Sequence, residues 1–236
     1  MRGAVNNHVM AGSKTRIRIR ESPFWQAYHE HRYAILFYAL LLTLILSPVA
    51  AAIGLPGAVI KILLAACLFA ALMPNATKRT RTALVTAISL LVLARFVSEL
   101  DSVPVNLGVV LAVVGFTGLA AAAAALRYTV TADRVNSETL YAALGTYLLA
   151  GIFFGQVYWS IERIHAGSFA GPDGFSELIA IYYSFVTLAT LGYGDVLPRT
   201  DIARGAAVFE VIGGQLFLAV MVARLIGAFE ATNRRA

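Results

Sequence analysis

One short stretch of the chain alternates glycine with larger residues and ends in an acid: the hexapeptide TLGYGD, from Thr190 to Asp195. Glycine adopts backbone conformations that other residues resist, so Gly192 and Gly194 allow successive carbonyl groups to point to the same side. Carbonyl oxygens stacked at close spacing replace the hydration shell of a cation in a narrow passage. This stretch therefore predicts cation coordination by the backbone, for which no acidic side chain is required.

The residues before this stretch predict the element that positions it. A loop rich in Gly, Pro and Asp is followed by an apolar segment too short to cross a membrane. We expect a helix over residues 177–189, capped by Ser176 or Asp173. This helix is expected to enter the membrane part-way and to aim its C-terminal end, near Ala189, at a central cavity. The partial negative charge of that end favours a dehydrated cation.

The composition places the whole chain in a membrane. Of its 236 residues, 59% are hydrophobic and 14% are charged, and the mean hydropathy is +0.74. Such a chain is too apolar for an ordinary soluble domain. Each crossing takes roughly 20 apolar residues, so the length has room for about six crossings and short loops. The net charge of +6 comes from basic clusters at the ends of apolar runs, which indicates membrane orientation rather than nucleic-acid binding.

The apolar runs predict six spanning helices, at residues 33–53, 55–73, 81–97, 103–126, 140–161 and 203–229. Lys and Arg gather in the connections that lie inside the cell if the N-terminus does, so we expect both termini to be cytoplasmic. A signal-peptide cleavage site between Ser47 and Gly54 is the alternative for the first run, although that run reaches spanning length. Cys67 is the single cysteine and is interpreted as a small core residue.

With SFVTLATLGYGDVLP between its last two spans, the chain resembles the tetrameric potassium channels, whose filter is TVGYG or a close variant followed by Asp. The resemblance covers residues 140–229, and the first four spans match only in number. It implies an all-α membrane protein with six transmembrane helices, and with a re-entrant pore helix and filter between the fifth and sixth. One filter per chain implies a homotetramer.

The resemblance also divides the chain. Residues 1–32 are expected to form a cytoplasmic basic leader, residues 33–135 a four-span N-terminal membrane domain, and residues 136–236 the pore domain. The implied function is potassium conduction across the cell (inner) membrane. A less selective cation channel, a potassium-transporter subunit and a non-conducting membrane scaffold are the alternatives.

By the same resemblance, the carbonyl groups of Thr190, Leu191, Gly192 and Tyr193 bind K⁺, together with the Thr190 hydroxyl, and Gly194 completes the filter. Leu191 stands where Val is commoner in the family. Its side chain is expected to face away from the ion and to pack against the pore helix.

Four residues are expected to support the filter from behind: Tyr182, Tyr183, Thr187 and Asp195. The preferred hydrogen bond joins Tyr183 to Asp195. The alternative is that both tyrosines belong to the aromatic belt found at membrane–water interfaces. Val186 stands where some members of the family carry a buried acid, so that brace is not expected here.

The sixth span contains the candidates for gating. Glu210 is an acid within an apolar span, and such residues are functional suspects by default. Its expected partners lie behind the pore helix or near the outer half of the filter, with Arg204 as one possibility. A neutral structural role and a gating role both stay open. Gly213 and Gly214, of which Gly214 matches better, are interpreted either as a hinge or as close helix packing. Gln215 is expected to face the cavity.

Several classes of function and partner are not expected. The predicted loops contain no nucleophile–base set and no metal cluster, so we expect no enzyme and no cofactor, with K⁺ as the permeant ion. The expected partners are the lipid bilayer and further copies of the chain, without nucleic acid. No cytoplasmic ligand-binding domain is expected behind the last span. The fourth span, residues 103–126, contains no Lys, Arg, Asp or Glu, which predicts weak voltage dependence.

Overall fold

The computed structural model describes residues 23–54, 106–131, 137–171 and 174–233. Residues 23–30 belong to one compact unit, and residues 31–236 form a second unit that contains every element of the candidate site. The second and third expected spans, residues 55–73 and 81–97, lie outside the described residues.

Four helices in the described ranges are long and apolar enough to cross a membrane. They are α1 (Pro23–Ala52), α4 (Leu107–Thr131), α5 (Ser137–Ile164) and α7 (Asp201–Asn233), which correspond to the expected first, fourth, fifth and sixth spans. The chain is thus a mostly helical membrane protein, as its composition predicts. α1 begins earlier than expected, but it contains a non-helical residue at His31 (φ −118°, ψ 18°), and its apolar segment begins there.

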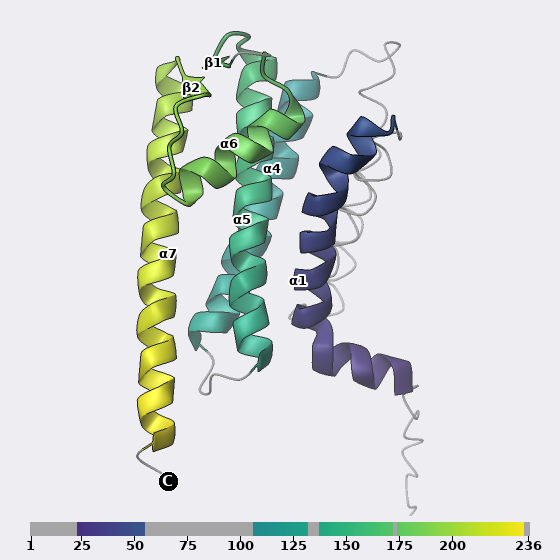
Figure 1. Ribbon diagram of the computed structural model, residues 1–236, viewed down its shortest axis with the longest axis vertical. Coiled ribbons are helices and arrows are strands. Elements are labelled where there is room, and N and C mark those ends of the chain that lie inside the picture. The colour runs from purple at the N-terminus through teal and green to yellow at the C-terminus, as the bar shows by residue number, and fades with distance from the viewer. Residues whose placement is uncertain (1–22, 55–105, 132–136, 172–173, 234–236) are drawn as a thin grey trace, which may run out of the picture. The chain divides into compact units, whose positions relative to one another are not determined.

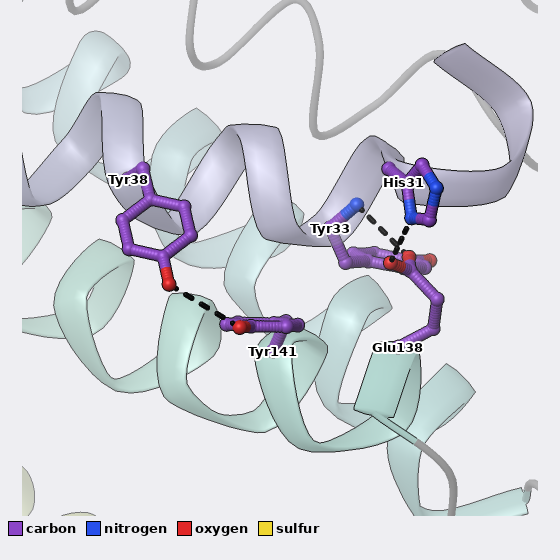
Figure 2. A network of polar contacts seen from close by, with 5 residues as sticks. All are labelled: His31, Tyr33, Tyr38, Glu138 and Tyr141. Atoms are coloured by element: carbon purple, nitrogen blue, oxygen red, sulfur yellow. Dashed lines mark hydrogen bonds and ion pairs between the residues drawn. The ribbon is translucent and has the colours of Figure 1, made fainter. Parts of the chain in front are cut away.

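Polar contacts join the membrane segment of α1 to the start of α5 (Figure 2). The Tyr33 N–H, in the first turn after the break at His31, donates to Glu138 Oε2 at 3.2 Å. His31 Nδ1 lies 4.0 Å from Glu138 Oε1, and the hydroxyls of Tyr38 and Tyr141 are 3.2 Å apart. Because the first N–H groups of a helix lack partners within it, a carboxylate from a neighbouring helix is a suitable cap at this break.

Small residues let α4 and α5 pack closely along their length. A Cβ atom placed at Gly118 would lie 2.0 Å from the Phe153 ring, and one at Gly115 would lie 2.8 Å from Val157 Cγ2. Such close approach of backbones is the usual way in which helices associate inside membranes. The buried cluster around this contact includes apolar side chains from three helices: Tyr33, Leu36, Leu40, Ala121, Ala122, Ala142, Leu149, Ile152 and Phe153.

The segment between α5 and α7 forms a closed loop. Figure 1 shows α6 (Glu177–Leu188) crossing obliquely between α5 and α7. On either side of this excursion lie two short antiparallel strands, β1 (Phe169–Ala170) and β2 (Leu197–Pro198). The Arg199 N–H donates to the Ser168 carbonyl at 2.8 Å beside them. The strands therefore hold together the two ends of the predicted re-entrant segment.

α7 buries little of its apolar surface in the single chain. Only 17% of its most apolar window is buried, against 67% for α5. Large apolar side chains are exposed along it: Ile202, Val208, Phe209, Ile212, Leu216, Leu218, Val220, Val222, Leu225 and Ile226. An apolar surface of this extent requires lipid or other protein chains to cover it.

Candidate functional site

α6 begins where the sequence predicts. Ser176 is its N-cap, in an extended conformation (φ −111°, ψ 170°), and its Oγ accepts a hydrogen bond from the Ile179 N–H at 3.3 Å. Gln156 of α5 donates to Glu177 Oε1 at 2.9 Å, which ties this end of α6 to the preceding helix. Asp173, the other candidate cap, lies outside the described residues.

Two glycines of α5 allow α6 to pack closely against it. A Cβ atom at Gly155 would lie 2.7 Å from the Ile181 Cα, and one at Gly151 would lie 2.5 Å from the Phe185 ring. Because the first of these contacts is with the backbone, α6 rests directly on α5 at this point. The position of the short helix is therefore set by the shape of α5.

The chain after α6 turns back through backbone hydrogen bonds. The Thr190 N–H donates to the Thr187 carbonyl at 2.9 Å. The Val186 carbonyl accepts from the Leu191 N–H at 2.9 Å and faces the Gly192 N–H at 3.5 Å. The start of TLGYGD is thus held to the last turn of α6 by main-chain groups alone.

The backbone of TLGYGD alternates in handedness. Thr190, Gly192 and Gly194 have positive φ angles of 58°, 57° and 78°, whereas Leu191 and Tyr193 between them do not. Among the described residues, Thr190 is the one non-glycine residue with positive φ. A left-handed conformation at a β-branched residue costs about 1–3 kcal/mol, and such strain concentrates at functional sites. This alternation of φ is the backbone pattern that the spacing of the glycines predicts.

The side chains of Leu191 and Tyr193 extend away from this turn. They are 56% and 66% exposed in the single chain. The expectation that Leu191 packs against the pore helix is therefore wrong for the single chain. The backbone of the TLGYGD turn is hydrogen-bonded to α6, but these bonds do not place the Leu191 side chain against α6.

Asp195 is bound by a different tyrosine from the one expected. The Tyr182 hydroxyl donates to Asp195 Oδ2 at 2.7 Å, and Asp195 Oδ1 accepts from the Val196 N–H. Tyr183 instead is buried and lies edge-on to Tyr158, with ring centroids 5.0 Å apart. Successive helical residues are about 100° apart around the axis. Only one of the two tyrosines therefore faces Asp195, and Tyr183, being buried, is not a belt residue.

By the resemblance to potassium channels, Tyr182→Phe is expected to change the lifetime of the conducting state, because it removes the hydroxyl that holds Asp195. The loss of one hydrogen bond predicts a change of about twofold to tenfold. Tyr183→Phe is the matched control, since Tyr183 makes no bond to Asp195. Single-channel open times in a lipid bilayer measure the effect. A larger change for Tyr183→Phe than for Tyr182→Phe would contradict the observed bond.

Glu210 of α7 is fully buried behind α6. Its Oε2 lies 2.5 Å from the Tyr158 hydroxyl, and its Oε1 lies 2.5 Å from Ser184 Oγ. A partner behind the pore helix is thus confirmed. Arg204 is not that partner, because it lies 3.7 Å from Asp201 and donates to the Pro198 carbonyl.

Sequence reasoning did not identify Tyr158 and Ser184 as functional candidates. Hydroxyl groups are common in apolar helices, and nothing in their local sequence marks these two. The one available signal was Glu210 itself, because a buried acid requires hydrogen-bond donors from neighbouring helices.

The glycines of α7 differ in their surroundings. A Cβ atom at Gly214 would lie 2.9 Å from the Leu188 carbonyl oxygen, whereas one at Gly213 would meet nothing within 4 Å. The close-packing interpretation therefore describes Gly214 in this structure, where α7 is one continuous helix. Gln215, the expected cavity residue, is exposed in the single chain.

A short helix that stops at an alternating turn, between two long apolar helices, is the arrangement expected for a pore-loop ion channel. In agreement, residues 143–231 match the family model described as "Ion channel". This range includes most of α5, all of α6, the TLGYGD turn and most of α7.

Curated relatives support the same class. The chain is 29% identical over 98 residues to "Putative potassium channel protein YugO" of Bacillus subtilis, a match that covers 41% of this chain and 27% of the relative. It is 42% identical over 66 residues to "Putative potassium channel protein RPA4233" of Rhodopseudomonas palustris, covering 27% and 16%. It is 29% identical over 97 residues to "Two-pore potassium channel 4" of Arabidopsis thaliana, covering 41% and 33%.

The chain therefore spans a third or less of the length of these relatives. No solved structure matches it. The comparisons confirm the resemblance to pore-loop potassium channels and indicate a channel rather than an enzyme. The apolar helices and the match to an ion-channel family model indicate an integral membrane protein.

Proposed function

We propose that the chain is one subunit of a potassium-selective channel, in which residues 190–194 form the filter. The observation that carries this proposal is the alternation of φ along TLGYGD, held to α6 by the Val186 and Thr187 carbonyls. The carbonyls of residues 190–193 and the Thr190 hydroxyl are the proposed K⁺ ligands. No cofactor takes part, and K⁺ is the permeant ion.

Four copies are proposed to surround one axis, because each chain contains one TLGYGD and a potassium filter needs four such loops. The exposed face of α7 and the exposed Tyr193 then contact neighbouring copies. The whole subunit has six spans: a cytoplasmic leader at 1–32, a membrane domain at 33–135 and the pore domain at 136–236. Both termini lie in the cytoplasm, and the assembly lies in the cell (inner) membrane.

The elements have distinct roles in conduction. The C-terminal end of α6 faces the cavity, where its partial negative charge stabilises an ion that has lost water. Gln215 offers this cavity an uncharged polar lining. Movement of α7 about Gly213 or Gly214 opens the path to the cytoplasm.

The test is the reversal potential of the reconstituted protein under a gradient of K⁺ against Na⁺. A K⁺-selective filter moves the reversal potential close to the K⁺ equilibrium potential. A value near zero in a conducting protein indicates a less selective cation channel. Complete absence of K⁺ flux from vesicles, with the protein folded and oligomeric, indicates a non-conducting scaffold.

We predict that the conductance is only weakly voltage-dependent. One charge that crosses the whole membrane field contributes about 2.3 kcal/mol per 100 mV, and steep gating sums several such charges in each subunit. α4 carries none of these from Leu107 to Leu126, and its Arg127 lies at the C-terminal end, where it is exposed. Arg224 of α7 donates to the Val130 carbonyl. It does not belong to a series of regularly spaced basic residues such as a voltage sensor requires.

Open probability against voltage, in symmetric K⁺ without divalent ions, measures this dependence. We expect a shallow curve that corresponds to less than about one moving charge. A curve that changes e-fold within a few millivolts would show that a voltage sensor is present.

A further inference from the structure

Five oxygen atoms from three helices meet around Glu210, and we call them the Glu210 cluster. They are Tyr158 Oη, the two carboxyl oxygens of Glu210, Ser184 Oγ and the Gly151 carbonyl oxygen. Ser184 Oγ lies 2.5 Å from Glu210 Oε1 and also 2.7 Å from the Gly151 carbonyl oxygen. Tyr158 Oη lies 2.5 Å from Glu210 Oε2. Tyr158, Ser184 and Glu210 are all 0% exposed, so water does not reach their side chains in the single chain.

Each of these three short oxygen–oxygen contacts requires one proton. A tyrosine hydroxyl and a serine hydroxyl each supply one proton, and a backbone carbonyl supplies none. The third proton has to come from Glu210. If Glu210 were ionised, two acceptor oxygens would face each other at 2.7 Å or less with no hydrogen between them.

The surroundings of Glu210 also favour the protonated, neutral carboxylic acid. In the part of the chain that the structure describes, the ionisable groups that interact with Glu210 are tyrosines, namely Tyr147 and Tyr158 of α5 and Tyr183 of α6. Neither ion pair found in the described part of the chain includes Glu210. A buried carboxylate without a cation partner is strongly disfavoured, whereas a hydrogen-bonded carboxylic acid is not.

We propose that Glu210 is a neutral carboxylic acid that positions the filter. Its Oε1–H donates to Ser184 Oγ, Ser184 donates to the Gly151 carbonyl, and Tyr158 donates to Glu210 Oε2. With this arrangement each of the three oxygen–oxygen contacts contains one proton. It joins α5, α6 and α7 at a single point.

The cluster acts on the filter through α6. Ser184 lies on the same turn of α6 as Val186, whose carbonyl holds the N–H groups of Leu191 and Gly192. A shift of Ser184 therefore moves the acceptor that fixes the start of TLGYGD. Because Glu210 belongs to α7, movement of that helix reaches the filter by this route. Glu210 is thus a positioning residue that touches no permeant ion.

Infrared spectroscopy of the full-length reconstituted protein tests the protonation state. We expect a carbonyl stretching band of a protonated carboxylic acid that disappears in Glu210→Gln and shifts in Ser184→Ala. If Glu210→Gln instead removes only carboxylate bands, the proposed state is overturned. Because the band is observed whether or not the protein selects K⁺, this result stands apart from the outcome of the reversal-potential test.

Channel recordings test the positioning role, which rests on the proposed channel function. Glutamine keeps a donor and a carbonyl acceptor at the positions of the neutral acid's O–H and C=O, and its amide adds one further N–H. Glu210→Gln is therefore expected to retain the wild-type open time within about twofold. Glu210→Leu leaves the Tyr158 hydroxyl without its acceptor and is expected to change the ratio of conducting to non-conducting filter by about tenfold or more. Equal, large defects in both variants would overturn the neutral-acid role.

Two further variants keep the test decisive if Glu210→Leu fails to fold. Ser184→Ala and Tyr158→Phe each remove one hydroxyl and leave the acid in place. Both are expected to shorten the open time while the reversal potential stays at the wild-type value. Unchanged open times in both variants would show that the cluster does not position the filter.

Discussion

Gly192→Ala is expected to abolish potassium selectivity or conduction. Gly192 has a φ of 57°, in the left-handed region. There an L-residue with a Cβ atom is destabilised by roughly 1–2 kcal/mol, and in the proposed tetramer four such residues meet in one filter. The added Cβ meets nothing within 4 Å in the single chain. The defect therefore comes from the backbone conformation and not from a collision within the subunit.

Gly167→Ala is the matched control for this substitution. Gly167 also has a positive φ, of 84°, and a Cβ atom there also meets nothing within 4 Å. It lies in the loop before β1, outside the filter. Both variants bear a similar backbone cost, but only Gly192→Ala is expected to change the reversal potential under a K⁺–Na⁺ gradient. Normal selectivity in Gly192→Ala would show that the filter does not depend on this conformation.

The sequence predicted the pore helix closely because its signals are local. The expected helix covered residues 177–189 and α6 is Glu177–Leu188, with Ser176 as the cap. A capping hydroxyl and a glycine-containing turn act over one or two helical turns, so they are readable from a short window. The alternating φ angles follow from the same kind of local information, since glycine tolerates positive φ.

The contacts of the site were less predictable because they depend on helix rotation and on distant partners. A choice between Tyr182 and Tyr183 is a choice between directions about 100° apart on α6. An error of one residue in the position of the helix therefore selects the wrong tyrosine. For this reason Tyr183 was predicted as the partner of Asp195, whereas the structure has Tyr182. The partners of Glu210 lie 26 and 52 residues away in the chain. Their meeting depends on how α5, α6 and α7 pack together, and no local pattern encodes it.

The close packing of α6 against α5 predicts the second large effect, which is a loss of stability on substitution of Gly155. Alanine is better than glycine in a helix by about 1 kcal/mol, so a Gly→Ala change within α5 stabilises the helix unless the new methyl group collides. At Gly155 it collides, because the Cβ atom would lie 2.7 Å from the Ile181 Cα. At Gly145 it does not, because its nearest neighbour, Leu36 Cδ2, is 3.9 Å away.

We therefore expect Gly155→Ala and Gly145→Ala to change stability in opposite directions. Overpacking costs about 1–3 kcal/mol, which exceeds the gain in helix propensity, and a backbone contact offers no side chain that can move aside. Gly155→Ala is expected to lower the midpoint of thermal unfolding in detergent and to displace α6 with its filter, so that conduction falls as well. Gly145→Ala is expected to leave conduction unchanged and to keep or raise the midpoint. If both variants unfold at the same temperature, the backbone of α6 does not rest on Gly155, and the filter must be positioned from elsewhere.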